Sequence, residues 1–134
     1  MVIAYVEVSA SRAKALRDAN QPVPNPVQIR GLVDTGASCT CIDPKVLTDL
    51  GLTPTGTTTV ITAGNLPEER EQYDVTLIIP GATQGDPALE IDAIPVVASK
   101  LLDIQGFHAL IGRDVLGTCV MNYNGTMRTF TIAY

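Results

Sequence analysis

Aromatic residues are scarce in this sequence: they make up 4% of its 134 residues, and tryptophan is absent. The hydrophobic core must therefore be built from the smaller side chains of Val, Ile, Leu and Ala. No apolar run approaches the ~20 residues of a membrane-spanning helix, and no stripe of Lys and Arg is present of the kind that binds nucleic acid. We therefore expect neither a membrane nor a nucleic acid among its partners.

Histidine and cysteine are also rare: the chain has one His, His108, and three Cys, at positions 39, 41 and 119. A Cys-x-Cys pair without further ligands does not make a zinc site. We therefore expect no metal and no cofactor, and we interpret Cys39 and Cys41 as small apolar residues that fill space on a strand. The odd number of cysteines, and an N-terminal segment too short for a signal peptide, favour a reducing compartment such as the cytoplasm.

The residues that are abundant indicate one mostly β domain over residues 1–134. Val, Ile and Thr recur in short runs, and 11 Gly and 9 Pro lie between these runs, which is the pattern of strands joined by turns. A C-terminal hairpin is expected to turn at Asn124-Gly125. The other expected strands are 2–9, 27–34, 39–42, 57–62, 70–80, 88–98 with a break or bulge at Pro95, and 107–112.

One or two short helices are expected beside the strands. The stretch 43–51 has a cap residue in Asp43, a first-turn proline in Pro44 and a terminating glycine in Gly51. A single helical turn is expected over 113–117. Residues 9–20 are polar and rich in Ala, and we expect them to form a loop, with a helical turn as the alternative.

One predicted strand runs directly into a carboxylate, in "GLVDTGAS" at 31–38. A second apolar stretch, "ALIGRDVL" at 109–116, also runs into a glycine and an acid, and a predicted hairpin lies between the two. A DTG triplet alone is a weak signal, but the ordered set of DTGAS, hairpin and LIGRD is specific. Over about residues 27–123 the chain resembles the retroviral-type (retropepsin-like) aspartic proteases, and its longer C-terminus is similar to that of cellular members.

The resemblance implies a closed or partly open β-barrel-like acid-protease fold with a flap, and catalytic residues Asp34, Thr35 and Gly36. Peptide hydrolysis without a metal needs an activated water, which two carboxylates that share one proton can provide. The chain supplies only one DTG, and Asp114 lacks the context of a second such turn. We therefore interpret Leu110, Ile111 and Gly112 as a loop that lies beneath the DTG turn and supports it. The second acid is therefore expected from another copy of the chain, in a two-fold symmetric homodimer.

The hairpin around residues 62–66 would be the flap that covers an extended peptide or protein substrate. By resemblance, Thr35 would reach across to its counterpart in the partner and Gly36 would leave room beside the carboxylate. We interpret Arg113 as part of a structural salt bridge, with a contact to Asp114, to the backbone or to a partner subunit as the alternatives. We interpret Asp114 as an acid in the first turn of a helix. The substrate-binding residues that the resemblance implies are Ala37, Cys39, Cys41, Thr62, Ala63, Gly64, Asn65, Phe107, His108 and Leu110.

The function predicted is that of an aspartic endopeptidase acting on extended segments with apolar side chains beside the scissile bond. Two alternatives stay open at this point. The same dimer could be a catalytically silent module that binds peptides under its flap. The chain could also be a structural assembly domain, in which the C-terminal hairpin makes the dimer and the cleft is incidental.

Overall fold

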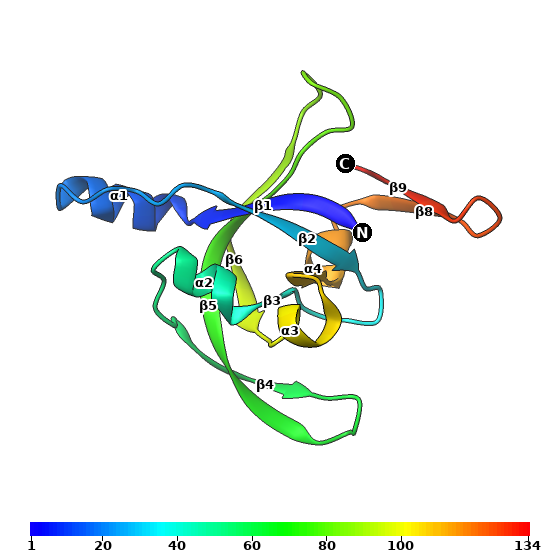
Figure 1. Ribbon diagram of the computed structural model, residues 1–134, viewed down its shortest axis with the longest axis horizontal. Helices are drawn as coiled ribbons and strands as arrows, with labels where there is room; N and C mark the ends of the chain where they lie inside the picture. Colours follow the sequence, from blue (N-terminus) through cyan, green and yellow to red (C-terminus); the bar gives the residue numbers. More distant parts are fainter.

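The first strand, β1 (Val2–Val8), alternates apolar side chains into the core, where Ala4, Val6 and Val8 are buried. In the computed structural model, which describes residues 1–134, β1 pairs antiparallel with both β2 (Val27–Val33) and β5 (Pro67–Ile79). The order continues through β7 (Ala109–Ile111), β3 (Cys41–Ile42) and β6 (Leu89–Ala98) to β5. Because β1 pairs with both ends of this order, the sheet closes into a six-stranded barrel (Figure 1). The expected mostly β, barrel-like fold is confirmed.

The barrel interior is aliphatic, as the scarcity of aromatic residues requires. Phe107 is the single aromatic side chain that is buried. Burial of each large aliphatic side chain contributes about 1.5–3 kcal/mol relative to leaving it in water. The largest fully buried side chains include Val6, Ile29, Ile42, Leu47, Leu50, Val75, Leu77, Val96, Ile111 and Val115.

One strand lies outside the barrel and forms the predicted hairpin. Strand β4 (Gly56–Ile61) pairs only with the first part of β5, from Gly56 opposite Gln72 to Ile61 opposite Pro67. This hairpin extends away from the barrel at the bottom of Figure 1. We call residues 56–72 the flap.

The expected helix after Asp43 is present as α2 (Pro44–Asp49), and the Asp43 side chain caps it by accepting the backbone N–H of Lys45. The expected helical turn is present as α4 (Arg113–Leu116). A third short helix, α3 (Leu102–Gln105), was not predicted, and it ends at Gly106 in the left-handed region. None of the helices is long and apolar enough to span a membrane.

The loop expected over residues 9–20 is wrong: these residues form α1 (Ala10–Asp18). Ser9 caps the helix by accepting the N–H of Arg12, and only Ala13 and Leu16 are buried. Two apolar contacts and a cap are too weak a periodic signal to predict a helix that stands away from the barrel (Figure 1).

The strand expected over 88–98 is not broken at Pro95, and its bulge lies just before that residue. Strand β6 continues through Pro95, which lies opposite Asp74. The register shifts where Val75 and Leu77 of β5 face Ile94 and Ile91, so the extra residue of the bulge lies on β6. On β6 the matching distortion falls at Ala93, whose φ of 53° is left-handed. A proline is tolerated in a strand where the ladder needs no N–H from it.

The C-terminal hairpin is present as β8 (Val120–Asn124) and β9 (Thr129–Ala133), but its predicted two-residue turn is wrong. Asn124 and Thr129 are the last pair, so the loop is the four residues 125–128. The side chain of Asn124 accepts the N–H of Met127, and the left-handed residue is Arg128 rather than Gly125. This side-chain bond stabilises a wider turn than the Asn-Gly pair indicated.

Candidate active site

The DTG turn begins where β2 ends, and backbone bonds hold it in place. The N–H of Asp34 donates to the carbonyl of Ile111 at 3.0 Å, and the N–H of Gly36 donates to Oδ1 of Asp34 at 2.9 Å. A Cβ atom on Gly36 would lie 3.1 Å from that same carboxylate oxygen. Because Gly36 has no side chain, its N–H can approach the carboxylate of Asp34 closely. This bond fixes the orientation of the carboxylate in the turn.

Strand β7 supports this turn from below, as we inferred from "LIGRD". It lies between β2, with which it pairs in parallel, and β3, with which it pairs antiparallel. Gly112 follows β7 directly and passes against the chain between the turn and β3: a Cβ there would lie 2.6 Å from both the carbonyl carbon and the oxygen of Cys39. The two signatures of the sequence therefore pack backbone against backbone.

A side-chain clamp that the sequence did not reveal joins the two signatures. Thr40 is fully buried, and its hydroxyl donates to Oδ1 of Asp114 at 2.7 Å while it accepts the N–H of Gly112 at 3.1 Å. The N–H of Thr40 donates to Oδ2 of Asp114 at 2.8 Å. Asp114 also accepts the N–H of Val115, so it does lie in the first turn of α4, but most of its bonds go to Thr40.

The salt bridge expected for Arg113 is wrong, and the alternative of a contact with the backbone is confirmed. Its guanidinium donates to the backbone carbonyl of Thr35 at 2.9 Å, and its N–H donates to the carbonyl of Ala37 at 2.9 Å. The chain contains three ion pairs, and none of them includes Arg113. Position 38 is Ser, which offers no charge, so the guanidinium binds the nearest carbonyl of the turn instead.

A cleft of about 850 Å³ lies beside the DTG turn. Its walls come from the turn and the start of β3, from the flap, and from β6. Asp92 and Asp114 are its charged side chains, and most of the others are apolar or small. The lining residues are Gly36, Ala37, Ser38, Cys39, Cys41, Thr58, Thr59, Val60, Ile61, Gln72, Ile91, Asp92, Ala93, Ile94, Pro95, Val97 and Asp114.

The structure brings some of the predicted substrate-binding residues to this cleft and leaves others outside it. Ala37, Cys39 and Cys41 line it. Burial, with a further contribution from Cys39, raises the pKa of the Cys41 thiol to about 11. Cys41 is therefore a neutral wall residue near pH 7 and not a nucleophile.

The flap tip lies beyond the cleft lining. Thr62 closes the tip: its N–H donates to the carbonyl of Leu66 at 3.2 Å, and its hydroxyl contacts the same oxygen. Asn65 takes the left-handed conformation that the turn needs, with φ 60°, between these two residues. Contact of Thr62, Ala63, Gly64 and Asn65 with a substrate stays a prediction.

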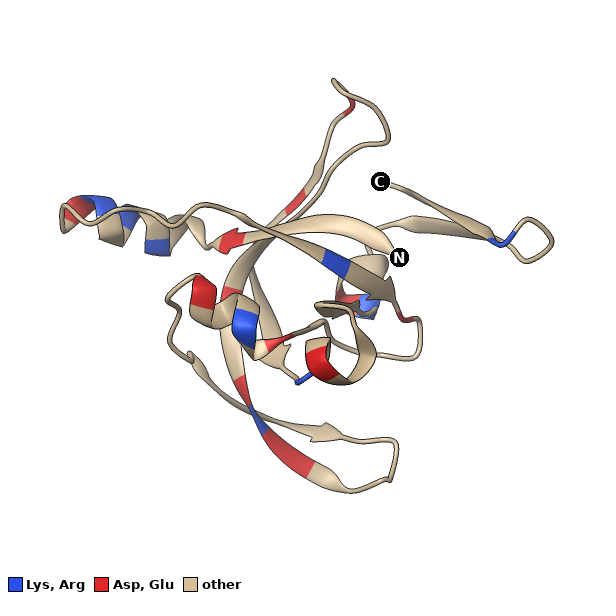
Figure 2. Cartoon of the chain, in the orientation of Figure 1, with Lys and Arg blue, Asp and Glu red and all other residues tan.

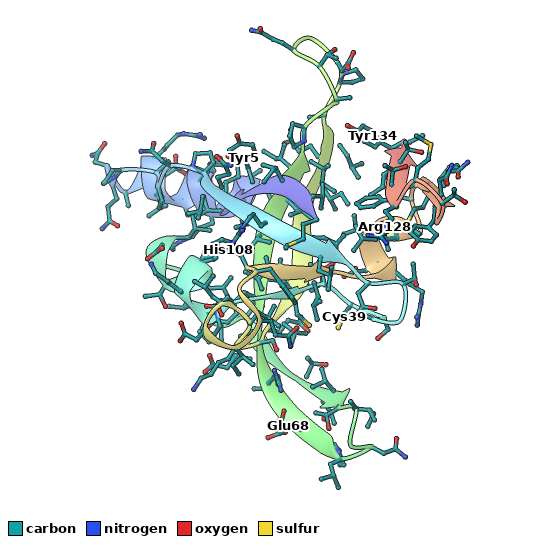
Figure 3. The ribbon with its side chains drawn as sticks, turned by 45° about the vertical axis from the view of Figure 1, so that its right-hand side comes forward. Tyr5, Cys39, Glu68, His108, Arg128 and Tyr134 are labelled. Atoms are coloured by element: carbon teal, nitrogen blue, oxygen red, sulfur yellow. The ribbon has the colours of Figure 1, made fainter.

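Three further predicted residues lie away from the cleft of the single chain. Phe107 is buried in the interior. His108 bonds with Arg30, whose N–H donates to its Nδ1 at 3.1 Å, and Figure 3 shows it well apart from Cys39. Leu110 lies on β7 between Leu32 and Cys41. A role for these residues in substrate binding stays a prediction.

The cleft residues that were not predicted from the sequence come mainly from β6 and from β4, the first strand of the flap. One wall consists of Ile91 to Pro95 and Val97, and another consists of Thr58 to Ile61. Both segments were predicted as strands, but which strands would face the DTG turn depends on sheet order, for which the sequence carries no direct signal.

Asp43, between β3 and α2, is a buried carboxylate that holds this side of the barrel together. Its Oδ2 accepts the N–H groups of both Leu101 and Leu102 at 2.8 Å, and its Oδ1 accepts that of Lys45 at 2.9 Å. Burial alone would raise the pKa of Asp43, but the three backbone donors, with Leu102 foremost, outweigh burial and hold the pKa below its ordinary value.

An Asp43→Asn variant should therefore be less stable by about 1–3 kcal/mol, because its amide NH2 would face backbone donors that need an acceptor. A folded-state pKa below the unfolded one stabilises the protein above the unfolded pKa and ceases to do so as the pH falls through the folded pKa. Urea unfolding at pH 7 and at acidic pH would measure both effects: the difference between wild type and variant should shrink on acidification below about pH 4. The exposed Asp49, at the other end of α2, supplies the control Asp49→Asn. A variant as stable as wild type at pH 7 would contradict this role of Asp43.

Comparison with known proteins agrees with this geometry. A family model described as "Aspartyl protease" matches residues 20–115. Among solved structures, the protease of simian foamy virus (mac), determined in solution, is similar with 17% sequence identity over 86% of this chain and 91% of that chain, at a TM-score of 0.45. A search of curated proteins found no match. The family match spans both the DTG turn and the strand that supports it, and the chain therefore belongs to the aspartyl protease family, in its retropepsin-like form.

Proposed function

We propose that this protein is an aspartic endopeptidase whose active site is completed by a second copy of the chain. The observation that carries the proposal is the single DTG turn, fixed by Ile111, Gly112 and Arg113 beside a cleft that the flap also lines. A lone carboxylate cannot both take a proton from water and give one to the peptide carbonyl. Two such turns that face each other across a two-fold axis would provide both groups.

The end of the barrel that carries Asp34 has exposed apolar side chains that a second copy could cover. Leu32, two residues before Asp34, is 38% exposed, and β1 starts beside it, with Val2 opposite Gly31. Met1 is 62% exposed and Ile3 is 41% exposed at this start. Scattered apolar side chains are normal on a surface, but a group of them around an incomplete site supports an interface.

The C-terminal hairpin adds to this apolar surface. It leaves the barrel after α4, the helix whose Arg113 holds the DTG turn, and it forms a separate two-stranded sheet. One of its faces carries the cross-strand pairs Met121–Ile132 and Tyr123–Phe130. Its bonds to the barrel come from the hydroxyl of Tyr134. A two-stranded hairpin is marginally stable in isolation, so pairing with the same hairpin of a partner would stabilise it.

The proposed reaction follows from this arrangement. An extended peptide would lie in the cleft between the DTG turn and the flap, with apolar side chains against Cys39, Cys41 and Ile94. One Asp34 of the dimer would hold the shared proton and polarise the scissile carbonyl, while the other would take a proton from the attacking water. The flap would exclude bulk water and bind the peptide backbone. No step of this reaction requires a cofactor.

Cleavage of a diverse peptide library by the purified protein tests the proposal. Cleaved peptides should carry apolar residues at the scissile bond, and the rate should fall above the pH at which the dyad loses its shared proton. The specific activity should also fall on dilution, in parallel with a dimer-to-monomer transition measured by analytical ultracentrifugation. Activity that is independent of concentration in a proven monomer would overturn the shared site.

A further inference from the structure

The flap leaves the barrel at a defined position on β5. From Gln72 onward, β5 pairs with the barrel strand β6, beginning with Gln72 opposite Val97. Before Gln72, β5 pairs only with β4. The backbone contact between flap and barrel therefore ends at the Gln72–Val97 pair, and any motion of the flap must hinge there.

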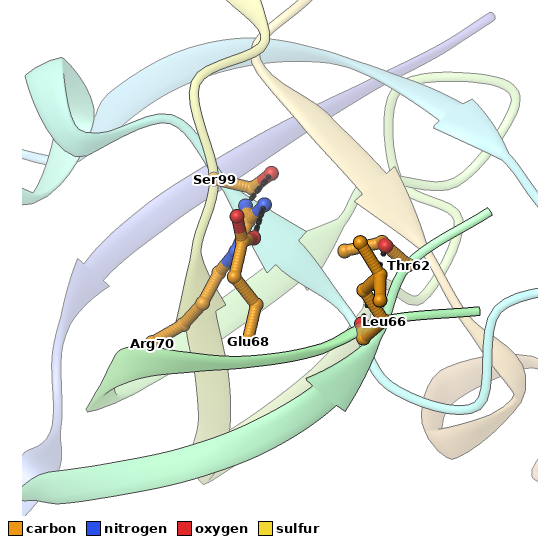
Figure 4. Close-up of polar contacts among 5 residues, drawn as sticks. All are labelled: Thr62, Leu66, Glu68, Arg70 and Ser99. Atoms are coloured by element: carbon orange, nitrogen blue, oxygen red, sulfur yellow. Dashed lines mark hydrogen bonds and ion pairs between the residues drawn. The ribbon is translucent and has the colours of Figure 1, made fainter. Parts of the chain in front are cut away.

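A side-chain bond lies directly beyond this hinge. If the antiparallel register were continued by two residues, Arg70 would lie opposite Ser99, and the guanidinium of Arg70 does donate to the hydroxyl of Ser99 at 2.6 Å (Figure 4). This side-chain bond therefore continues the contact between β5 and the chain after β6, beyond the point where their backbone pairing ends. Arg70 is the single Lys or Arg of the flap, where Figure 2 shows one basic segment between acidic ones.

Both partners of this bond are themselves held in place. The Nε of Arg70 donates to Oε2 of Glu68 at 2.9 Å, and its Nη2 contacts the same oxygen, so the guanidinium is fixed on the inner side of the strand (Figure 4). The side chain of Arg70 is 28% exposed, so this ion pair is partly shielded from water. On the barrel side, the N–H of Ser99 donates to the carbonyl of Ile42 at 3.0 Å.

The chain of contacts runs from the flap to the floor of the cleft. Ile42 belongs to β3, whose first residue, Cys41, lines the cleft and follows the clamped Thr40. A shift of the flap base at Arg70 would therefore have to break the bond to Ser99 or move β3. The barrel resists such a movement, because Ile42 is fully buried in the core.

We propose that Arg70 is a positioning residue, which holds the base of the flap against Ser99 and so sets the height of the flap above the cleft. The expected change in KM rests on the proposed function, whereas the expected change in flap mobility does not. With the bond in place, the flap is already close to the position that it takes over a bound peptide. Binding then loses less conformational entropy of the flap. Without the bond, the flap gains freedom below its tip while the DTG turn is untouched.

The test uses two variants that remove the bond from either side, Arg70→Met and Ser99→Ala, together with the double variant. Each should raise KM for the best library peptide by about threefold to tenfold, the loss expected for one hydrogen bond of ordinary strength, and should leave kcat within about twofold. The double variant should be no worse than Arg70→Met alone, because both changes remove the same contact. Arg70→Lys should restore part of the affinity, since an ammonium can reach Ser99 but cannot make the paired contact with Glu68.

Hydrogen exchange of the backbone amides provides a readout that does not need catalysis. In the absence of peptide, the flap amides over 56–61 should exchange at least about threefold faster in Arg70→Met than in wild type, while the buried amides of β1 should not change. If wild type cleaves no peptide, the proposed function fails and the exchange measurement still decides the role of Arg70. Unchanged exchange in the flap, an unchanged KM, or additive effects in the double variant would each overturn the proposal.

Discussion

An Asp34→Asn protein is expected to cleave peptides about a hundredfold to ten-thousandfold more slowly than wild type, the range that general acid–base catalysis contributes. In the proposed dimer, the change replaces both carboxyl groups at once, and an amide can neither hold the shared proton nor take one from water. The turn itself should persist, because the amide oxygen of Asn can still accept the N–H of Gly36, as Oδ1 of Asp34 does now. The measurements are kcat/KM on the best library peptide and the dissociation constant for the same peptide.

Asp18→Asn is the matched control for this experiment. Asp18 is the last residue of α1, the helix that stands away from the barrel in Figure 1. It forms an exposed surface pair with Lys14, and such a pair contributes little. Its loss should leave cleavage unchanged. An Asp34→Asn protein that cleaves as fast as wild type would refute the proposed chemistry.

Peptide binding separates the three functions that the sequence leaves open. An enzyme predicts that Asp34→Asn still binds the peptide that it no longer cleaves. A silent binding module predicts equal binding by wild type and Asp34→Asn, with cleavage by neither. An assembly domain predicts no peptide affinity in either protein, together with dimers that depend on the C-terminal hairpin.

The part of the site that could be predicted from the sequence is the part set by local chemistry. A strand that ends at an acid, followed by Gly36, predicts a tight turn with a fixed carboxylate, and the structure contains that turn. The sequence also indicates that Gly112 of "LIGRD" belongs to a loop beneath this turn, and in the structure Gly112 passes close to the backbone of Cys39. Each of these two stretches can be recognised from neighbouring residues alone. Their order along the chain, with a hairpin between them, completes the pattern that resembles the protease family.

The part that could not be predicted depends on contacts between residues far apart in the chain. Thr40 and Asp114 are separated by 74 positions, and neither has a local pattern that indicates a partner. The sequence offered a simple local role for Asp114, as an acid at a helix start, and this role accounts for only one of its bonds. The walls of the cleft on β6 were missed for the same reason, because sheet order is a property of the whole barrel.

A Gly112→Ala protein should be less stable than wild type by about 3 kcal/mol, at the upper end of what overpacking costs, because the added methyl group has no space. The φ of Gly112 is -90°, which any residue can adopt, so the requirement for glycine is a requirement for room. The atoms that the methyl group would meet, at 2.6 Å, belong to the backbone of Cys39, and the carbonyl oxygen of Ala37 would lie at 3.1 Å. These atoms cannot move away by a change of rotamer.

The same displacement should reduce activity as well as stability, because the segment that must move carries the DTG turn at one end and the cleft wall at the other. Urea unfolding would measure the stability, and kcat/KM at a temperature where the variant is still folded would measure the activity. Gly56→Ala is the control for the stability measurement: a Cβ there meets no atom within 4 Å, so this variant should be as stable as wild type or more stable by up to about 1 kcal/mol. If Gly112→Ala were within about 0.5 kcal/mol of wild type, the size of an ordinary surface substitution, the chain beneath the DTG turn would be compliant. The carboxylate would then owe its position to the partner subunit rather than to this packing.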